Sequence, residues 1–161
     1  MARNAVQVVV DELDRFINDV MKKLALDLVA ALAAAPSEGG TPIDTGWASA
    51  NWIPYIGSPR SSPDGVRPNN AAHGQNNASR TAQETGVATV ATTFRHDNGA
   101  PLGVANAVPY IIELNDGGSS QAGSGFVQKA MHKVVRNFRK ELRNANRSHG
   151  RFGDLDSGSE F

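Results

Sequence analysis

The sequence predicts an α+β fold in which a long N-terminal helix and a basic C-terminal helix pack on a small, mostly antiparallel β-sheet with long polar loops. Apolar residues recur at helical steps of three and four from about residue 4 to 35 and again from 126 to 142. Between these stretches, short β-branched and aromatic runs are bounded by Gly, Pro and Asn. The chain has 161 residues, of which 40% are hydrophobic. We expect one α+β domain over 1–150, containing the loop 58–77, and a polar C-terminal tail over 151–161.

The first predicted helix is longer than a small domain needs for its own core. At a rise of 1.5 Å per residue, some 30 residues span about 45 Å. Pro36 and the Gly39-Gly40 pair end the helix. Two interpretations stay open: the helix lies wholly across its own domain, or one end of its apolar stripe packs on a partner. The stripe consists of Val6, Val10, Leu13, Ile17, Val20, Leu24, Leu28 and Leu32.

The segment after this helix contains the tripeptide Asp44-Thr45-Gly46 and has the composition of a turn. Aspartic proteases also use Asp-Thr-Gly, but their chemistry requires two carboxylates that share a proton. The chain has one copy of this motif, so proteolysis would need a dimer. The sequence has no Cys, no His cluster at metal-ligand spacing and no Gly-x-Ser-x-Gly motif. We therefore expect a protein that is not an enzyme and that uses no cofactor and no metal.

The middle of the chain predicts strands and one further helix. Residues 48–57 are rich in strand-forming side chains, and Pro54 favours an edge strand to which a second chain adds its own. Residues 58–77 are polar and predict a long loop. Residues 79–94 fit either a helix or a strand, and we predict a helix.

Two further strands and the last helix complete the prediction. Leu102 to Val108 and Tyr110 to Leu114 are predicted as strands, followed by a turn at Asn115 to Gly118. The last helix is predicted to begin near Ser124, which acts as its cap, and to give way to a polar tail past Asn144.

Charge is distributed unevenly along a chain whose formal net charge is zero. Acidic residues are in excess over 1–57, whereas basic residues are in excess over 129–161. This polarity suits contact between the acidic end of one copy and the basic end of another, or between the basic end and an acidic partner. In the alternative interpretation, the basic face of the last helix is an ordinary solvated surface with no partner. No helix-turn-helix or zinc pattern accompanies it, so DNA contact would neutralise phosphates without reading bases. No apolar run is long enough to cross a bilayer, and we expect no membrane partner.

A family resemblance rests on anchor points from the first helix to the start of the last. These are the Asp-Thr-Gly turn and the runs Val108-Pro109-Tyr110-Ile111, Leu114-Asn115-Asp116-Gly117, Ser119-Ser120-Gln121-Ala122 and Gly125-Phe126-Val127. In these features the chain resembles the neck and tail-completion (head-tail joining) proteins of long-tailed bacteriophages, over roughly the first nine-tenths of its length. Gly123 departs from the pattern, because such proteins often have Pro there.

The resemblance implies a structural role. The expected function is that of a virion neck subunit, assembled in the host cytoplasm, which forms a ring between the portal side of the capsid and the tail tube around the DNA channel. The implied partners are further copies of the chain, in a hexamer or alternatively a dodecamer. Head-closure or connector proteins and tail-terminator or tail-tube proteins are the implied neighbours, and the ring also allows non-specific contact with genomic DNA. The alternatives are a tail terminator subunit and a nucleic-acid-binding accessory protein.

Two sets of residues are predicted to carry this role. Four arginines in and just after the last predicted helix are predicted to face the DNA channel or an acidic partner: Arg136, Arg139, Arg143 and Arg147. The second set is predicted to form the oligomer or neck interface: Trp47, Trp52, Tyr55, Tyr110, Asn115, Asp116, Gly117, Ser119, Ser120, Gln121 and Phe126.

Overall fold

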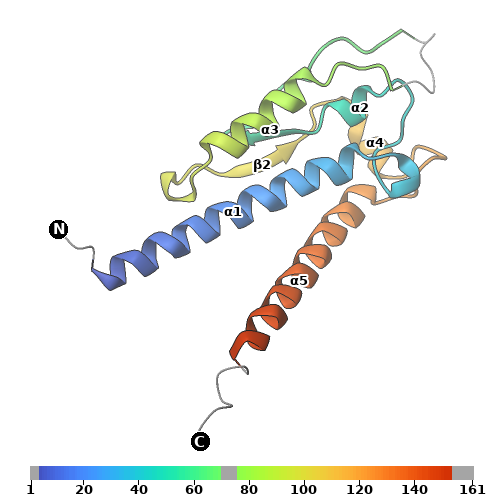
Figure 1. Cartoon of the computed structure of the whole chain (residues 1–161). Coiled ribbons are helices and arrows are strands. Elements are labelled where there is room, and N and C mark those ends of the chain that lie inside the picture. The colour runs from blue at the N-terminus through green and yellow to red at the C-terminus, as the bar shows by residue number, and fades with distance from the viewer. Residues whose placement is uncertain (1–3, 70–75, 154–161) are drawn as a thin grey trace, which may run out of the picture.

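The computed structural model describes residues 4–69 and 76–153 and confirms the α+β class (Figure 1). Two long helices and a two-stranded antiparallel sheet dominate it. None of the helices in the described part of the chain is both long enough and apolar enough to cross a membrane. In chain order the elements are α1 (Ala5–Ala33), η1 (Pro36–Glu38), α2 (Trp47–Ala50), β1 (Ile53–Ile56), α3 (Thr81–Thr93), η3 (His96–Asn98), β2 (Leu102–Ala105), α4 (Ile111–Asn115) and α5 (Phe126–Gly153).

In the sheet β1 and β2 run antiparallel, with Ile53 opposite Ala105 and Ile56 opposite Leu102, and α3 lies between the two strands in sequence. Helix α3 lies along β1, while α1 passes beneath the sheet and contacts both strands (Figure 1). The predicted arrangement placed both terminal helices on the sheet. In the structure α5 instead makes its main contact with α1, and the two helices diverge toward their free ends (Figure 1).

The core lies where α1, the sheet and α5 meet. Leu32, Trp52, Phe126 and Ala130 form its buried cluster. The rings of Trp52 and Phe126 meet edge to face, with centroids 6.5 Å apart. This aromatic pair joins the segment before β1 to the first turn of α5, and edge-to-face packing adds stabilisation beyond the buried area. The core therefore fixes the root of α5 but not its far end.

Helix α1 confirms the predicted first helix. The side chain of Asn4 accepts a hydrogen bond of 3.1 Å from the amide of Val6, which caps the helix. At the other end the amide of Thr41 donates to the carbonyl of Leu32 after the chain has turned through η1. Lys23 of α1 bridges to Glu141 of α5 at 3.3 Å, so one polar contact links the helices beyond the core. Because both side chains are substantially exposed, this ion pair adds little stability.

The predicted strand over 48–57 is correct only for its second half. Trp47–Ala50 is a helical turn, and only Ile53–Ile56 pairs with β2. Gly46 has a φ of 79°, which favours glycine, and its carbonyl accepts from the amide of Ala50. The strand edge is also less open than predicted, because a Cβ built on Gly86 of α3 would lie 2.8 Å from the carbonyl oxygen of Pro54. At this point α3, and not a second chain, lies against β1.

The predicted strand over 110–114 is wrong, because these residues form the short helix α4. Ile111 and Leu114 both pack against the core cluster, whereas Ile112 between them is 72% exposed. Two core contacts three residues apart require helical geometry, since residues in a strand return to the same face every second position. Contact with the core therefore selects the helical conformation of this short run, whose residues also favour a strand.

The predicted strand over 102–108 stops early, at Ala105. The next residue, Asn106, accepts a hydrogen bond from the amide of Val108 at 3.0 Å through its side-chain oxygen. Its side-chain nitrogen donates to the carbonyl of Ala48 at 2.8 Å. This local turn offers the backbone an alternative to continued strand pairing. The helix predicted over 79–94 is confirmed as α3, and the described residues of the predicted loop, 58–69 and 76–77, contain no helix or strand.

Helix α5 begins at Phe126 and is anchored by a residue other than the predicted cap. The side-chain oxygen of Asn115, not that of Ser124, accepts from the amide of Val127 at 3.0 Å. The backbone carbonyl of Asn115 also accepts from the amide of Gly125. The helix continues to Gly153, well past the predicted change to a polar tail after Asn144. The remainder of the predicted tail, 154–161, lies outside the described residues.

Replacing Asn115 by alanine is expected to destabilise the protein by about 1 kcal/mol, because the amide of Val127 loses its acceptor. Asn115→Asp is the matched control, since a carboxylate keeps the acceptor and is favourable near a helix N-terminus. Urea unfolding of the three proteins measures the difference. Equal losses in both variants would show that the hydrogen bond does not anchor α5.

Candidate interface surfaces

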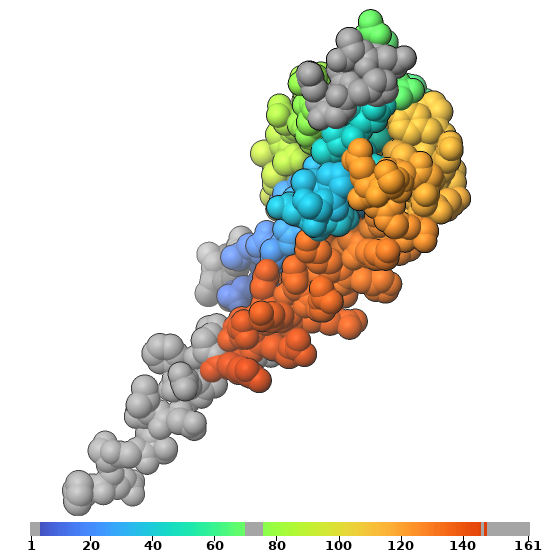
Figure 2. All heavy atoms as spheres, turned by 90° about the vertical axis from the view of Figure 1, so that its right-hand side faces the viewer, coloured from blue at the N-terminus to red at the C-terminus, as the bar shows by residue number. Residues whose placement is uncertain are grey.

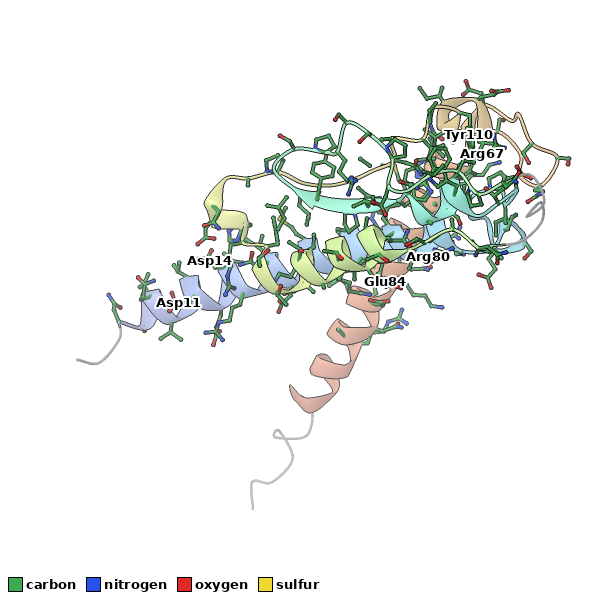
Figure 3. The ribbon with its side chains drawn as sticks, turned by 90° about the horizontal axis from the view of Figure 1, so that it is seen from above. Asp11, Asp14, Arg67, Arg80, Glu84 and Tyr110 are labelled. Atoms are coloured by element: carbon green, nitrogen blue, oxygen red, sulfur yellow. The ribbon has the colours of Figure 1, made fainter. Side chains whose placement is uncertain are left out.

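A pocket of about 330 Å³ lies between the turn that follows α1 and the segment that contains α4. Asp44 and Trp47 line one side, Tyr110 and Gln121 line the other, and Arg67 reaches in from the loop before α3. These residues come from three parts of the chain: the turn after α1, the loop before α3 and the segment that contains α4. Figure 3 shows Arg67 and Tyr110 together at the end of the molecule opposite the free end of α1.

Aromatic and charged side chains are stacked at this pocket. The rings of Trp47 and Tyr110 are tilted by 48° with centroids 6.1 Å apart, and the guanidinium of Arg67 lies 5.2 Å from the Tyr110 ring centroid. Arg67 also pairs with the carboxylate of Asp44 at 2.9 Å. The indole nitrogen of Trp47 donates to the carbonyl of Asp64 at 2.8 Å. The loop before α3 is thus attached to the pocket by Asp64 and Arg67.

The environment of Tyr110 perturbs its ionisation. Burial raises the pKa of Tyr110 above its ordinary value, the Arg67 guanidinium opposes this shift, and the Asp44 carboxylate adds to it. Because the folded state favours the neutral phenol, this group contributes stability that is present below the ordinary tyrosine pKa and is lost as the pH rises through the folded-state pKa.

Replacing Arg67 by methionine, an uncharged side chain of similar length that keeps the Tyr110 ring covered, is expected to raise the pKa of Tyr110 further, because the opposing positive charge is removed. The phenolate absorbance reports this titration. The chain has two tyrosines, so the experiment uses a Tyr55→Phe background. Arg60→Ala is the control, since Arg60 pairs with Asp64 and does not shift Tyr110. A downward shift after removal of Arg67 would contradict the assignment.

Gln121 fastens the loop after α4 to the turn after α1. Its side-chain oxygen accepts from the amide of Ile43 at 2.8 Å, and its side-chain nitrogen donates to the carbonyl of Ile43 at 2.8 Å. A primary amide satisfies both backbone groups of one residue in this way, as a neighbouring strand does. Gln121 therefore holds this loop against the turn that follows α1.

The structure separates the predicted interface residues into three groups. Trp52 and Phe126 are buried in the core, with exposed fractions of 6% and 2%, so the prediction that they form a surface is wrong. Large apolar side chains were read as contact residues when they are packing residues. The half-buried ring of Tyr55 lies over Gly103 of β2, and Asn115 supports α5. The rest lie at the pocket or on exposed parts of the adjoining loop: Trp47, Tyr110, Asp116, Gly117, Ser119, Ser120 and Gln121.

The four predicted arginines are exposed along α5. Figure 2 shows α5 running away from the body of the molecule beside part of α1. Arg139 and Arg143 are one helical turn apart, and Arg136 and Arg147 continue the same side of the helix. The helix therefore presents these guanidinium groups together on one surface.

Two features were missed from sequence. The first is Arg67, which lies in a polar stretch with no periodicity and is placed only by Asp44 and Tyr110. The second is the identity of the uncovered residues on α1: one end of the predicted stripe was expected either to lie on its own domain or to pack on a partner, and that stripe does not include the exposed Val9 and Phe16. The length of α1 was the one sequence signal that pointed to this surface, because a helix of 29 residues exceeds what the core contacts.

Asp44 is not a free carboxylate available for catalysis in this arrangement, because it forms an ion pair with Arg67. Among residues 4–69 and 76–153, no group of three or more His, Asp or Glu side chains is placed to hold a metal ion. Of the four histidines, His96 lies 3.5 Å from Asp14 and His132 is exposed. His73 and the His149 side chain lie outside the described part.

The fold and its surfaces define an α+β protein with a pocketed body and two diverging helices. No protein-family model, no curated protein and no solved structure matches the chain.

Proposed function

We propose that the chain is a structural subunit of a bacteriophage neck, which joins heads to tails as part of a ring around the DNA channel. One observation supports this proposal most: the segments on which the family resemblance rests are far apart in sequence but pack together. Gln121 bonds to Ile43 beside the Asp-Thr-Gly turn, and Tyr110 stacks on Trp47 immediately after that turn. A chance likeness of short runs would not be expected to define one packed unit.

The surface of α5 agrees with this role. Its exposed arginines lie on a helix that extends from the body, where a partner or the DNA phosphates can reach them. Arginine suits either target, because its planar fork matches carboxylate and phosphate oxygens. The neck proposal therefore predicts that joining depends on positive charge at these four positions.

Replacing Arg136, Arg139, Arg143 and Arg147 together by glutamate is expected to block the joining of heads to tails. All four side chains are exposed, so the fold should persist, which circular dichroism checks. The measurement is the yield of infectious particles in a complementation assay with the phage lacking this protein. Replacement by lysine at the same positions is the matched control, because it keeps the charge. Normal particle yields from the glutamate variant would contradict the proposal.

The exposed basic helix also favours a second candidate, a nucleic-acid-binding accessory protein. That function predicts tight binding of the isolated protein to DNA, with an affinity that falls steeply as salt rises. Light scattering with and without isolated tails or portal-bearing heads separates the candidates. A discrete ring, formed alone or with these partners, favours the neck or the related tail terminator. A monomer that binds neither tails nor heads but is retained on DNA favours the accessory protein.

A further inference from the structure

The N-terminal half of α1 exposes a continuous apolar stripe. Val6, Val9, Leu13 and Phe16 are 67%, 64%, 55% and 55% exposed and follow one another at steps of three and four. Farther along the same helix, Leu28, Ala31 and Leu32 pack into the core. The stripe is therefore covered near the root of α5 and uncovered where the two helices diverge (Figure 1). Grouped apolar exposure of this kind marks an interaction site more often than scattered single residues do.

Helix α5 has a complementary stripe. Met131, Val135 and Leu142 are 50%, 41% and 38% exposed and lie on one side of the helix. Arg139 is four residues after Val135 and three before Leu142, so it borders this stripe, and Arg143 follows one turn later. Each of the two long helices thus carries apolar residues that its own chain leaves in solvent.

The two stripes are bordered by opposite charges. Along residues 5–21 there are four carboxylates against one arginine, and along residues 131–147 there are six lysines and arginines against one glutamate. On α1, exposed Glu12 and Asp19 lie one turn on either side of Phe16. Figure 3 shows the acidic residues Asp11 and Asp14 on the same free half of α1. Apolar contact with opposite charge at its border is the pattern of a specific interface.

We infer that the N-terminal half of α1 in one copy docks against the Met131, Val135 and Leu142 stripe of α5 in a second copy of this chain. DNA would match the charge of α5, but it would repel the acidic border of α1 and leave its apolar residues exposed. A second copy satisfies both surfaces at once. Each copy carries one surface of each kind, so the contact is heterologous, and it propagates from copy to copy until it closes. This inference rests on the ring-forming part of the proposed function and assigns the surfaces that build the ring.

Engineered cysteines test the contact, because the chain contains no cysteine. Val9→Cys and Val135→Cys are made in separate proteins, one carrying a tag that changes its mobility. The two proteins are mixed with a bis-maleimide whose spacer tolerates a shift of about one helical turn, or 5.4 Å. Neither variant can cross-link within itself, so a mixed dimer reports an α1 to α5 contact between copies. Val66→Cys replaces either partner as the control, since Val66 is 90% exposed and lies on neither helix.

The mixed Val9 and Val135 dimer is expected to exceed the Val66 control by about tenfold or more at low salt, and to decline as salt screens the charged border. The protein that carries both Val9→Cys and Val135→Cys is expected to give a ladder of covalent oligomers. A product that stops at the dimer would show a closed two-fold pair and would overturn the head-to-tail arrangement. Cross-linking no better than the Val66 control would overturn the contact itself, and a pure Val9 to Val9 dimer would show that α1 packs on α1.

A charge exchange separates this interface from the neck role. Glu12→Lys with Asp19→Lys, and Arg139→Glu with Arg143→Glu, should each reduce the mixed dimer about tenfold, and mixing the two altered proteins should restore it. Failure of this rescue would overturn the assigned pairing. If the ladder is absent while glutamate at the four arginines still blocks head-to-tail joining, the neck role stands and this interface is wrong. If the ladder forms but joining is unaffected, the interface stands and the neck role is wrong.

Discussion

Replacement of Phe126 by alanine is expected to lower the free energy of unfolding by about 3–5 kcal/mol. Phe126 is 2% exposed and packs edge to face on Trp52, with Leu32 and Ala130 in the same cluster. Truncation removes the buried ring and leaves a cavity at the root of α5, which the surrounding backbone fills only in part. Chemical denaturation followed by circular dichroism measures the loss.

Phe16→Ala is the matched control for this prediction, because Phe16 is 55% exposed on α1. At a concentration at which the chain is monomeric, we expect its effect to stay within about 0.5 kcal/mol. A small effect at Phe126 would mean that this residue does not attach α5 to the core. It would also restore the rejected assignment of Phe126 to a surface contact.

Replacement of Thr41 by valine is expected to cost about 1–3 kcal/mol, although the two side chains have nearly the same shape. The hydroxyl of Thr41 accepts from the indole nitrogen of Trp52 at 2.6 Å and donates to the carbonyl of Leu32 at 2.7 Å. Thr41 and Trp52 are both buried, so the substitution leaves the indole donor of Trp52 without a partner and away from water, while the carbonyl of Leu32 still accepts from the backbone amide of residue 41. The measurement is again the free energy of unfolding from a denaturant titration.

Thr89→Val is the control, because Thr89 is exposed on α3 and its hydroxyl bonds only to the carbonyl of Thr85. A double-mutant cycle with Trp52→Phe isolates the pairing of Thr41 with the indole nitrogen. Additive losses in that cycle would contradict the coupling. Strong coupling would establish that the indole of Trp52 holds the end of α1 in place. It would also show that Trp52 does not serve as a subunit contact.

The candidate surfaces could be predicted only in part. Arg136, Arg139 and Arg143 lie on one exposed side of the last helix as predicted, because helical spacing alone determines which residues share a side. Arg147 was expected in a polar tail but continues the same helix. Trp47, Tyr110 and Gln121 were singled out from a local pattern, but their contacts with each other and with Ile43 depend on segments more than 60 residues apart. Arg67 carried no local signal, since its role exists only through Asp44 and Tyr110.

Local sequence specifies α1 and α5, the turn at Gly46, and the opposite charge of the two long helices, whereas the residues of α3 suit a strand as well as a helix. Long periodic segments and glycines with positive φ have one favourable local solution, so neighbours in sequence are enough to specify them. Packing between distant segments makes 111–115 helical, places Trp52 and Phe126 inside, and brings Asn115 to the start of α5. Runs of four or five residues gain too little from local geometry to choose between helix and strand. Their conformation was set by which side chains the core could bury and which backbone groups then needed a partner.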